Sequence, residues 1–359
     1  MNYPFIKSIR SIIGVLCIPL FASLLFTIRG ESYFLPASPN FLLYSLPDYN
    51  SVDATPLFAP FYFIFFGMML SDTGYGFVLA LGCFLFLKLL QPQGMMKQLA
   101  GVLCMGGIST VFMGLLFGCL FGVPWSTIFK GLPFENTFPL IDSSAQPIQM
   151  LALCAGMGIV HMYFGVGIAT WQCIKKGDWV GAFGDNFVWI TAVTGLLMLA
   201  APMLGLPAAV AAVGKWMAIV SGVVIVWAGG RASKSVGGKL ASGLFNAYNI
   251  TGWLGDVLSY ARVFALGLST GVIGLVLNTL GGMLYGAFQN GLILQGIGFL
   301  LTGVLLVFLH TFMMLINTLG TFVHTARLQY VEFFGKFYAA GGKPFKPLKY
   351  NAKSVRMDN

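Results

Sequence analysis

A single arginine interrupts a long apolar run of the sequence. Arg262 lies within "GDVLSYARVFALGLSTGVIG" (residues 255–274), and no carboxylate follows it at i+3 or i+4. Placing an arginine at the centre of a membrane helix costs about 2.5–3.5 kcal/mol on insertion scales. Charges kept in such a position usually belong to an ion pathway or to a pair with another group. Arg262 is therefore the first candidate for chemistry.

A second apolar run, residues 291–326, carries a polar stripe. His310, Asn317 and His324 are seven residues apart, which is two helical turns each, and Arg327 follows His324 by three. One predicted helix pair thus carries two arginines and polar groups that suit ion passage. The alternative is that Arg327 reaches the membrane surface and that the stripe only joins two helices.

Arg262 leaves two alternatives open. Its run has about a dozen apolar-dominated residues on one side and over twenty on the other, so its side chain cannot easily reach water. Asp256 is six residues earlier, on a different helix face. A structural salt bridge to Asp72 or Asp185 is one alternative, and a partner on another subunit is another.

The composition predicts the class of protein that positions these groups. Hydrophobic residues make up 57% of the 359 residues and charged residues 9%, against about 25% charged in a soluble domain. Apolar runs of membrane-spanning length recur, so we expect an all-α polytopic bundle of about 7–8 transmembrane helices. The 46 glycines suit close helix packing; Gly114, Gly118 and Gly122 recur every four residues.

The apolar runs divide the chain into three parts. We expect an N-terminal segment and linker (1–55, with a possible helix at 12–28), a transmembrane domain (56–335) and a basic cytoplasmic tail (336–359). The runs cover about 56–90, 98–121, 147–174, 185–205, 208–229, 246–284 and 291–326. Residues 56–90 form either a helical hairpin turning at Ser71–Gly76, which we favour, or one long helix. The last two runs are long enough to be tilted, antiparallel neighbours.

The formal net charge of +9 comes mainly from the connections and the C-terminus. In a membrane protein this pattern indicates topology and contact with anionic membrane lipids, not nucleic-acid binding. The connections near 175–184 and 230–243 are basic, so we expect them on the cytoplasmic side. The six cysteines show no CxxC spacing and fit packed thiols. We expect no cofactor, no metal site and no active site in this chain.

Three blocks resemble the membrane stator subunit of V/A-type rotary ATPases, called subunit I or subunit a. "LSYARVFALGLSTGVIG" resembles its arginine-bearing helix. "YSLPDYNSVDATPLFAPFYFIFFGMMLSDTGYG" resembles its entry into the membrane, and "FVHTARLQYVEFFGKFYAAGGKPFKPL" its C-terminal helix and tail. The blocks occur in the family's order and bracket residues about 41–348.

The resemblance implies a function in which a proteolipid ring rotates against this subunit while protons or sodium ions cross the membrane. Arg262 then matches the family's essential arginine and Arg327 its second one. The family also implies peripheral-stalk partners, and we expect an integral protein of the prokaryotic plasma membrane. It further implies a large cytoplasmic N-terminal domain that residues 1–40 do not resemble, so we expect a membrane-domain fragment or a short gene product.

Two offset half-channels would need polar walls. The stripe His310–Asn317–His324, with Gln329 and Glu332, is the candidate for one wall, and Ser259, Tyr260 and Asp256 for the other. Some members carry an acidic residue at the position of Asn317, so the asparagine leaves proton and sodium both open. Gly267, Gly271 and Gly274 would admit the ring closely or serve ordinary helix packing. The competing functions are a secondary ion transporter, although we find no inverted repeat, and a structural membrane scaffold.

Overall fold

The computed structural model describes residues 55–128, 130, 146–200, 202, 207–231, 235–288 and 292–338, and nearly all of them are helical. Within these ranges, seven helical segments are long and apolar enough to cross a membrane, and a shorter apolar helix covers Pro56–Leu70. The predicted all-α polytopic bundle is confirmed. The possible helix at 12–28, most of the connection 122–146 and the tail after residue 338 lie outside the described residues.

The elements follow the predicted runs closely. In chain order they are α2 (Thr55–Leu70), α3 (Thr73–Leu90), α4 (Met95–Phe117), β1 (Cys119–Leu120), β2 (Val123–Pro124), α5 (Trp125–Ile128), α6 (Pro147–Lys175), η2 (Gly181–Phe187), α7 (Val188–Ala200), α8 (Ala208–Gly230), α9 (Val236–Tyr248), α10 (Ile250–Ser259), α11 (Ala261–Gly286), α12 (Leu292–Arg327), η4 (Leu328–Phe333) and α13 (Phe334–Phe337). The two η elements are π-helical.

Helix α2 lies in the centre of the fold. Every residue from Phe58 to Leu70 is buried, and its side chains contribute to both apolar clusters of the core. It packs against α4, α11 and α12. An apolar run without polar positions therefore marks a helix that is covered by protein on all sides.

The run 56–90 divides into two helices, as the favoured interpretation requires. The break covers only Ser71 and Asp72, because the Asp72 carboxylate accepts a hydrogen bond from the Tyr75 backbone N–H at 3.1 Å and so caps α3. The prediction that these two helices pack against each other as a hairpin was wrong. Helix α3 packs along α4, and α2 makes little contact with α3.

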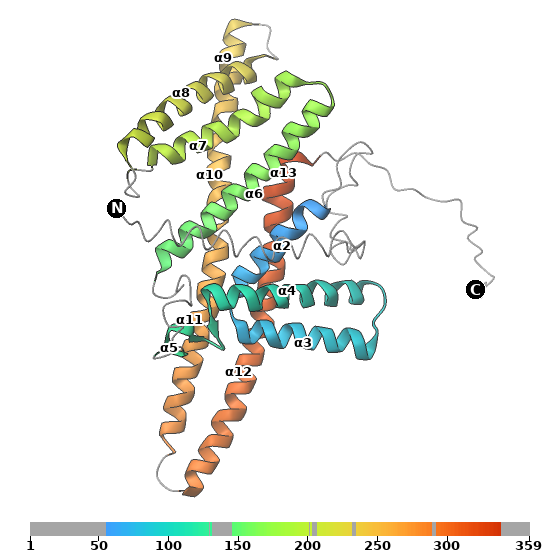
Figure 1. The fold of residues 1–359 in the computed structure, drawn as a ribbon, viewed down its shortest axis with the longest axis vertical. Coiled ribbons are helices and arrows are strands. Elements are labelled where there is room, and N and C mark those ends of the chain that lie inside the picture. Colours follow the sequence, from blue (N-terminus) through green and yellow to red (C-terminus); the bar gives the residue numbers. More distant parts are fainter. Residues whose placement is uncertain are drawn as a thin grey trace, which may run out of the picture.

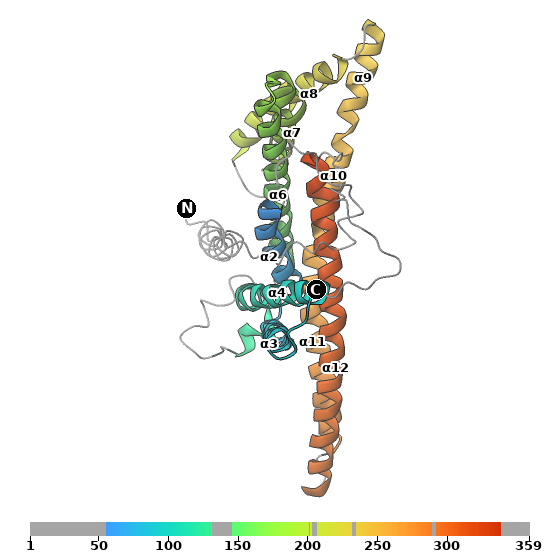
Figure 2. The same cartoon turned by 90° about the vertical axis from the view of Figure 1, so that its right-hand side faces the viewer.

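Helices α11 and α12 are antiparallel neighbours, as predicted. Asn278 of α11 meets His310 of α12, and Thr270 meets Asn317, so the contacts step along the two helices in opposite directions. In Figures 1 and 2 this pair runs across the pair α3–α4. The two pairs cannot both stand along the membrane normal, and this arrangement fits the predicted tilt of the last two helices.

Two helices are longer than the apolar runs predict. The connection 230–243 was expected as a loop, yet α9 begins at Val236, and α9, α10 and α11 form a nearly continuous segment from Val236 to Gly286. Val236, Leu240 and Leu244 recur every four residues there, but a glycine pair and Lys239 conceal the helix from a search for apolar runs. At the other end, the helix continues past Arg327 to Phe337.

A short β-hairpin after α4, absent from the sequence-based expectation, docks onto the break between α2 and α3. Its turn residues Phe121 and Gly122 have φ angles of 48° and 76°, in the left-handed region. The Asp72 carboxylate accepts the N–H groups of Phe121 at 3.0 Å and Gly122 at 2.8 Å. A buried carboxylate with three backbone donors is fully compensated, so Asp72 fixes the hairpin to α3.

Candidate functional site

Arg262 is the second residue of α11 and is half-buried. Its Nη1 atom is inaccessible to water and has no hydrogen-bond partner, and no ion pair in the described part of the chain includes it. Both intramolecular candidates are engaged elsewhere: Asp72 with the β-hairpin, and Asp185 with Arg231 at 2.6 Å. A structural salt bridge from Arg262 to either residue was therefore a wrong alternative.

Two residues at the C-terminal end of α12, His324 and Arg327, lie near Arg262. His324 lies close enough to interact electrostatically with both Arg262 and Arg327, and its Nδ1 is buried without a partner. Arg327 is exposed at the end of α12. The structure thus brings both arginines and His324 together, with the two guanidiniums in different surroundings.

A buried carboxylate lies next to the group formed by Arg262, His324 and Arg327. Glu332 of η4 is 2% exposed, its Oε2 has no hydrogen-bond partner, and its charge interacts with those of Arg262 and Asp256. Asp256 itself is paired with Lys336 at 2.5 Å. Ser259 is half-buried and donates to the Gly255 carbonyl oxygen at 3.1 Å.

Tyr260 lies in the packed core. It is fully buried, and its hydroxyl is 2.8 Å from His161 Nδ1. The His161 ring is held between Phe61 and Phe333, with centroid distances of 4.4 and 4.3 Å, and Gln329 lies next to it. His161 is therefore both packed between aromatic rings and paired with a hydroxyl group.

The remaining stripe residues line the interface between α11 and α12. His310 contacts the Tyr75 hydroxyl at 2.6 Å through Nδ1 and Asn278 Oδ1 at 3.2 Å through Nε2. Asn317 donates to Thr270 Oγ1 at 3.2 Å. The seven-residue spacing therefore does place one polar face of α12 toward its neighbours, in two groups: His310 near the β-hairpin and His324 near the arginines.

Sequence reasoning missed three residues of the group around His310 at the β-hairpin: Asp72, Tyr75 and Asn278. The Asn278 side chain donates to the Phe121 carbonyl oxygen at 2.7 Å, so it joins α11 to the β-hairpin. Two signals were available. Asp72 and Tyr75 belong to the "SDTGYG" interruption, and Asn278 is a lone amide in an apolar run.

The glycines of α11 pack inside this chain. A Cβ on Gly267 would lie 2.7 Å from the Met68 carbonyl oxygen, and a Cβ on Gly274 would lie 2.7 Å from Gly122 Cα. These two glycines thus admit α2 and the hairpin turn, which favours ordinary packing over approach by an outside ring. Gly271 is less crowded; its nearest neighbour is Cys119 Sγ at 3.8 Å.

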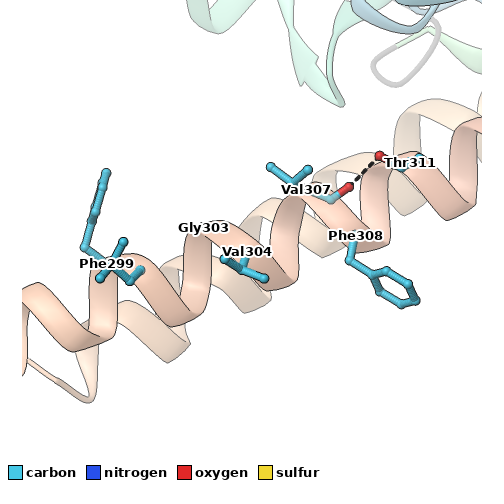
Figure 3. A pocket seen from close by; sticks show the side chains of 7 residues that line it. Phe299, Gly303, Val304, Val307, Phe308 and Thr311 are labelled. Atoms are coloured by element: carbon cyan, nitrogen blue, oxygen red, sulfur yellow. Dashed lines mark hydrogen bonds between the residues drawn. The ribbon is translucent and has the colours of Figure 1, made fainter.

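Much of the remaining surface of α12 is apolar and exposed. A shallow groove of about 590 Å³ lies there between Phe299 and Thr311, and Figure 3 draws the side chains that line it. The one hydroxyl there is satisfied within the helix, since Thr311 donates to the Val307 carbonyl oxygen at 2.7 Å. The exposed residues continue along α12 through Leu319 and Val323 to Arg327. This face can pack against lipid or another apolar helix, with a cation at its end.

Known proteins resemble the chain over most of its length. Residues 250–350 match the V-type ATPase 116kDa subunit family. The A-type ATP synthase subunit I of Methanocaldococcus jannaschii is 31% identical over 337 residues, covering 86% of this chain and 46% of the relative.

Two further relatives show the same pattern. The corresponding subunit of Thermococcus kodakarensis is 33% identical over 88% of this chain and 46% of the relative. The V-type ATP synthase subunit I of Borreliella burgdorferi is 24% identical over 87% of this chain and 52% of the relative. The chain spans about half the length of the curated relatives it matches.

Proposed function

Because the chain is a homologue of subunit I of the A- and V-type ATP synthases, we propose that it is the stator membrane subunit of a rotary ATPase. In this function it forms ion half-channels against a ring of proteolipid subunits and is joined to peripheral-stalk subunits. We place it in the prokaryotic plasma membrane, from the organisms of these relatives.

One observation carries this proposal: Arg262 is a half-buried guanidinium without an ion-pair partner in the described residues. A carboxylate on another protein would compensate it. At 4 Å and an effective dielectric constant of 20, the attraction between two unit charges is about 4 kcal/mol. That energy favours the ionised, ion-free carboxylate, so a proteolipid would release its ion before it passes Arg262 and take up another afterwards.

The polar groups on either side of Arg262 support two separate access routes. Gln329 and Glu332 lie beyond His324, past the C-terminal end of α12, and His310 with Asn278 lies toward the β-hairpin. The positive charge of Arg262 between them opposes the direct passage of a cation. Ions would therefore cross by way of the moving carboxylate.

Cysteine cross-linking in the assembled complex tests the proposed ring contact. Leu319 is 66% exposed on the face of α12 that leads to Arg327, so Leu319→Cys should form a disulfide with a cysteine near the proteolipid carboxylate. The matched control is Val223→Cys, which is 65% exposed on α8 and should form none. Equal cross-linking at both positions, or none at Leu319→Cys, would contradict this docking face.

Arg327→Gln should lower coupled ion transport only in part. Arg327 is exposed, so water can satisfy its charge, and its removal should weaken the ion barrier less than removal of Arg262. The measurement is ion uptake per ATP hydrolysed in vesicles that contain the mutant complex. A complete loss would mean that the assembled ring buries Arg327 in one deep site with Arg262.

A further inference from the structure

A groove of about 530 Å³ lies where α8 ends and α9 begins. Its lining comes from the last turn of α8 and the first turns of α9: Val226, Trp227, Gly230, Arg231, Val236, Lys239 and Leu240. In Figure 1 this junction lies at the end of the molecule opposite the α11–α12 turn. The helices approach closely there, since a Cβ on Gly230 would lie 2.8 Å from the Lys239 carbonyl oxygen.

The groove carries more positive charge than the described carboxylates neutralise. Arg231 forms an ion pair with Asp185, and its Nε–H donates to the Ala228 carbonyl oxygen at 3.1 Å. A guanidinium has five N–H donors, so Arg231 keeps further donors free. Its side chain is 32% exposed. Lys239 is exposed, and no ion pair among the described residues includes it. An anion would therefore meet two cations here and one already paired carboxylate.

The other walls of the groove are apolar and open. Trp227 is 61% exposed and stacks under the Arg231 guanidinium at 5.7 Å, while Val236 and Leu240 are 84% and 66% exposed. Exposed tryptophan is typical of the membrane–water boundary. The end of α6 repeats the arrangement, with Lys175 over Trp171 at 5.6 Å. These pairs place the groove at the headgroup level of the basic, cytoplasmic side.

We propose that this groove binds the headgroup of an anionic phospholipid. Arg231 and Lys239 would hold the phosphate by charge-assisted hydrogen bonds, and the acyl chains would lie along Val236 and Leu240. Phosphate chemistry alone would also fit free phosphate, but that ion makes no use of the exposed apolar walls. The groove on α12 in Figure 3 offers a contrast, because it has apolar walls and no cation.

Lipid titration of the purified full chain tests this site without ATP or a ring, so its result does not depend on the proposed function. The probe is fluorescent short-chain phosphatidylglycerol in zwitterionic micelles. Lys239→Gln breaks no contact and should weaken saturable binding about fivefold, the usual contribution of one basic residue at an anionic surface. Arg231→Gln should weaken it at least as much. The control is Lys215→Gln, which changes an exposed lysine of α8 outside the groove. This variant should bind like the wild type.

Three results would overturn the proposal. Phosphatidylcholine of the same chain length could bind equally well, which would remove the role of charge. Millimolar inorganic phosphate could displace the lipid, which would make the groove a site for the free ion. Lys239→Gln and Lys215→Gln could bind alike, which would place the lipid elsewhere. Saturable binding of phosphatidylglycerol that only the groove variants weaken would support it.

Discussion

Arg262→Gln is expected to abolish coupled ion transport. The substitution removes the charge that would make a passing carboxylate release its ion, and about 4 kcal/mol of lost attraction corresponds to roughly a thousandfold in that equilibrium. Assembly should survive, because Arg262 makes no ion pair within the described part of this chain whose loss would unfold it. The measurement is ATP-driven ion uptake by vesicles containing the complex, compared with the amount of assembled complex.

Two further variants separate charge from geometry. Arg262→Lys keeps the charge but replaces a planar, five-donor group with a compact ammonium, so it should also lose most of the transport. Lys88→Gln removes an exposed positive charge from α3 and should leave transport unchanged. Full coupled transport by Arg262→Gln would refute the proposed role of this residue.

Gly118→Ala is expected to destabilise the fold strongly. A Cβ at this position would overlap the Ser71 carbonyl oxygen, a backbone atom that cannot rotate away. Overpacking usually costs about 1–3 kcal/mol, and a clash with backbone at the α2–α3 break should reach the upper end or exceed it. The hairpin that follows would lose its place against Asp72. The measurement is the midpoint of thermal unfolding of the purified chain in detergent.

Gly82→Ala is the matched control for this prediction. Gly82 lies in α3, and no atom lies within 4 Å of the position that its Cβ would take. Alanine is favoured over glycine in a helix by about 1 kcal/mol, so this variant should be as stable as the wild type or slightly more stable. Equal midpoints for the two variants would mean that α4 does not dock on the break as described.

The sequence predicts the helices better than the contacts between them. Apolar runs locate the spans, and "SDTGYG" locates the break at Ser71–Asp72, because turn formers stand out in an apolar background. The β-hairpin could not be predicted, since two-residue strands have no periodicity. The donors to Asp72 at Phe121 and Gly122 are 49 and 50 residues away in the chain, so only the folded structure reveals them.

The candidate site was predicted in part for the same reason. A lone arginine in an apolar run is conspicuous, and regular spacing placed His310, Asn317 and His324 on one face. The core positions of Tyr260 and the α11 glycines depend on α2, α6 and the hairpin, which no spacing along α11 can report.

The long helical segment from Val236 to Gly286 must resist a mechanical force applied at one of its residues. It is about 75 Å long as a helix and bears Arg262 near its middle. On the proposed function, a rotating neighbour pulls sideways on that arginine. The segment is supported close to Arg262, where Gly267 and Gly274 pack directly against the backbone of Met68 and Gly122. A contact between side chains can give way when a side chain changes its rotamer. A contact between two backbone segments has no rotamer to change, so it is more rigid. These two backbone contacts thus lie within twelve residues of the charge that must stay in place.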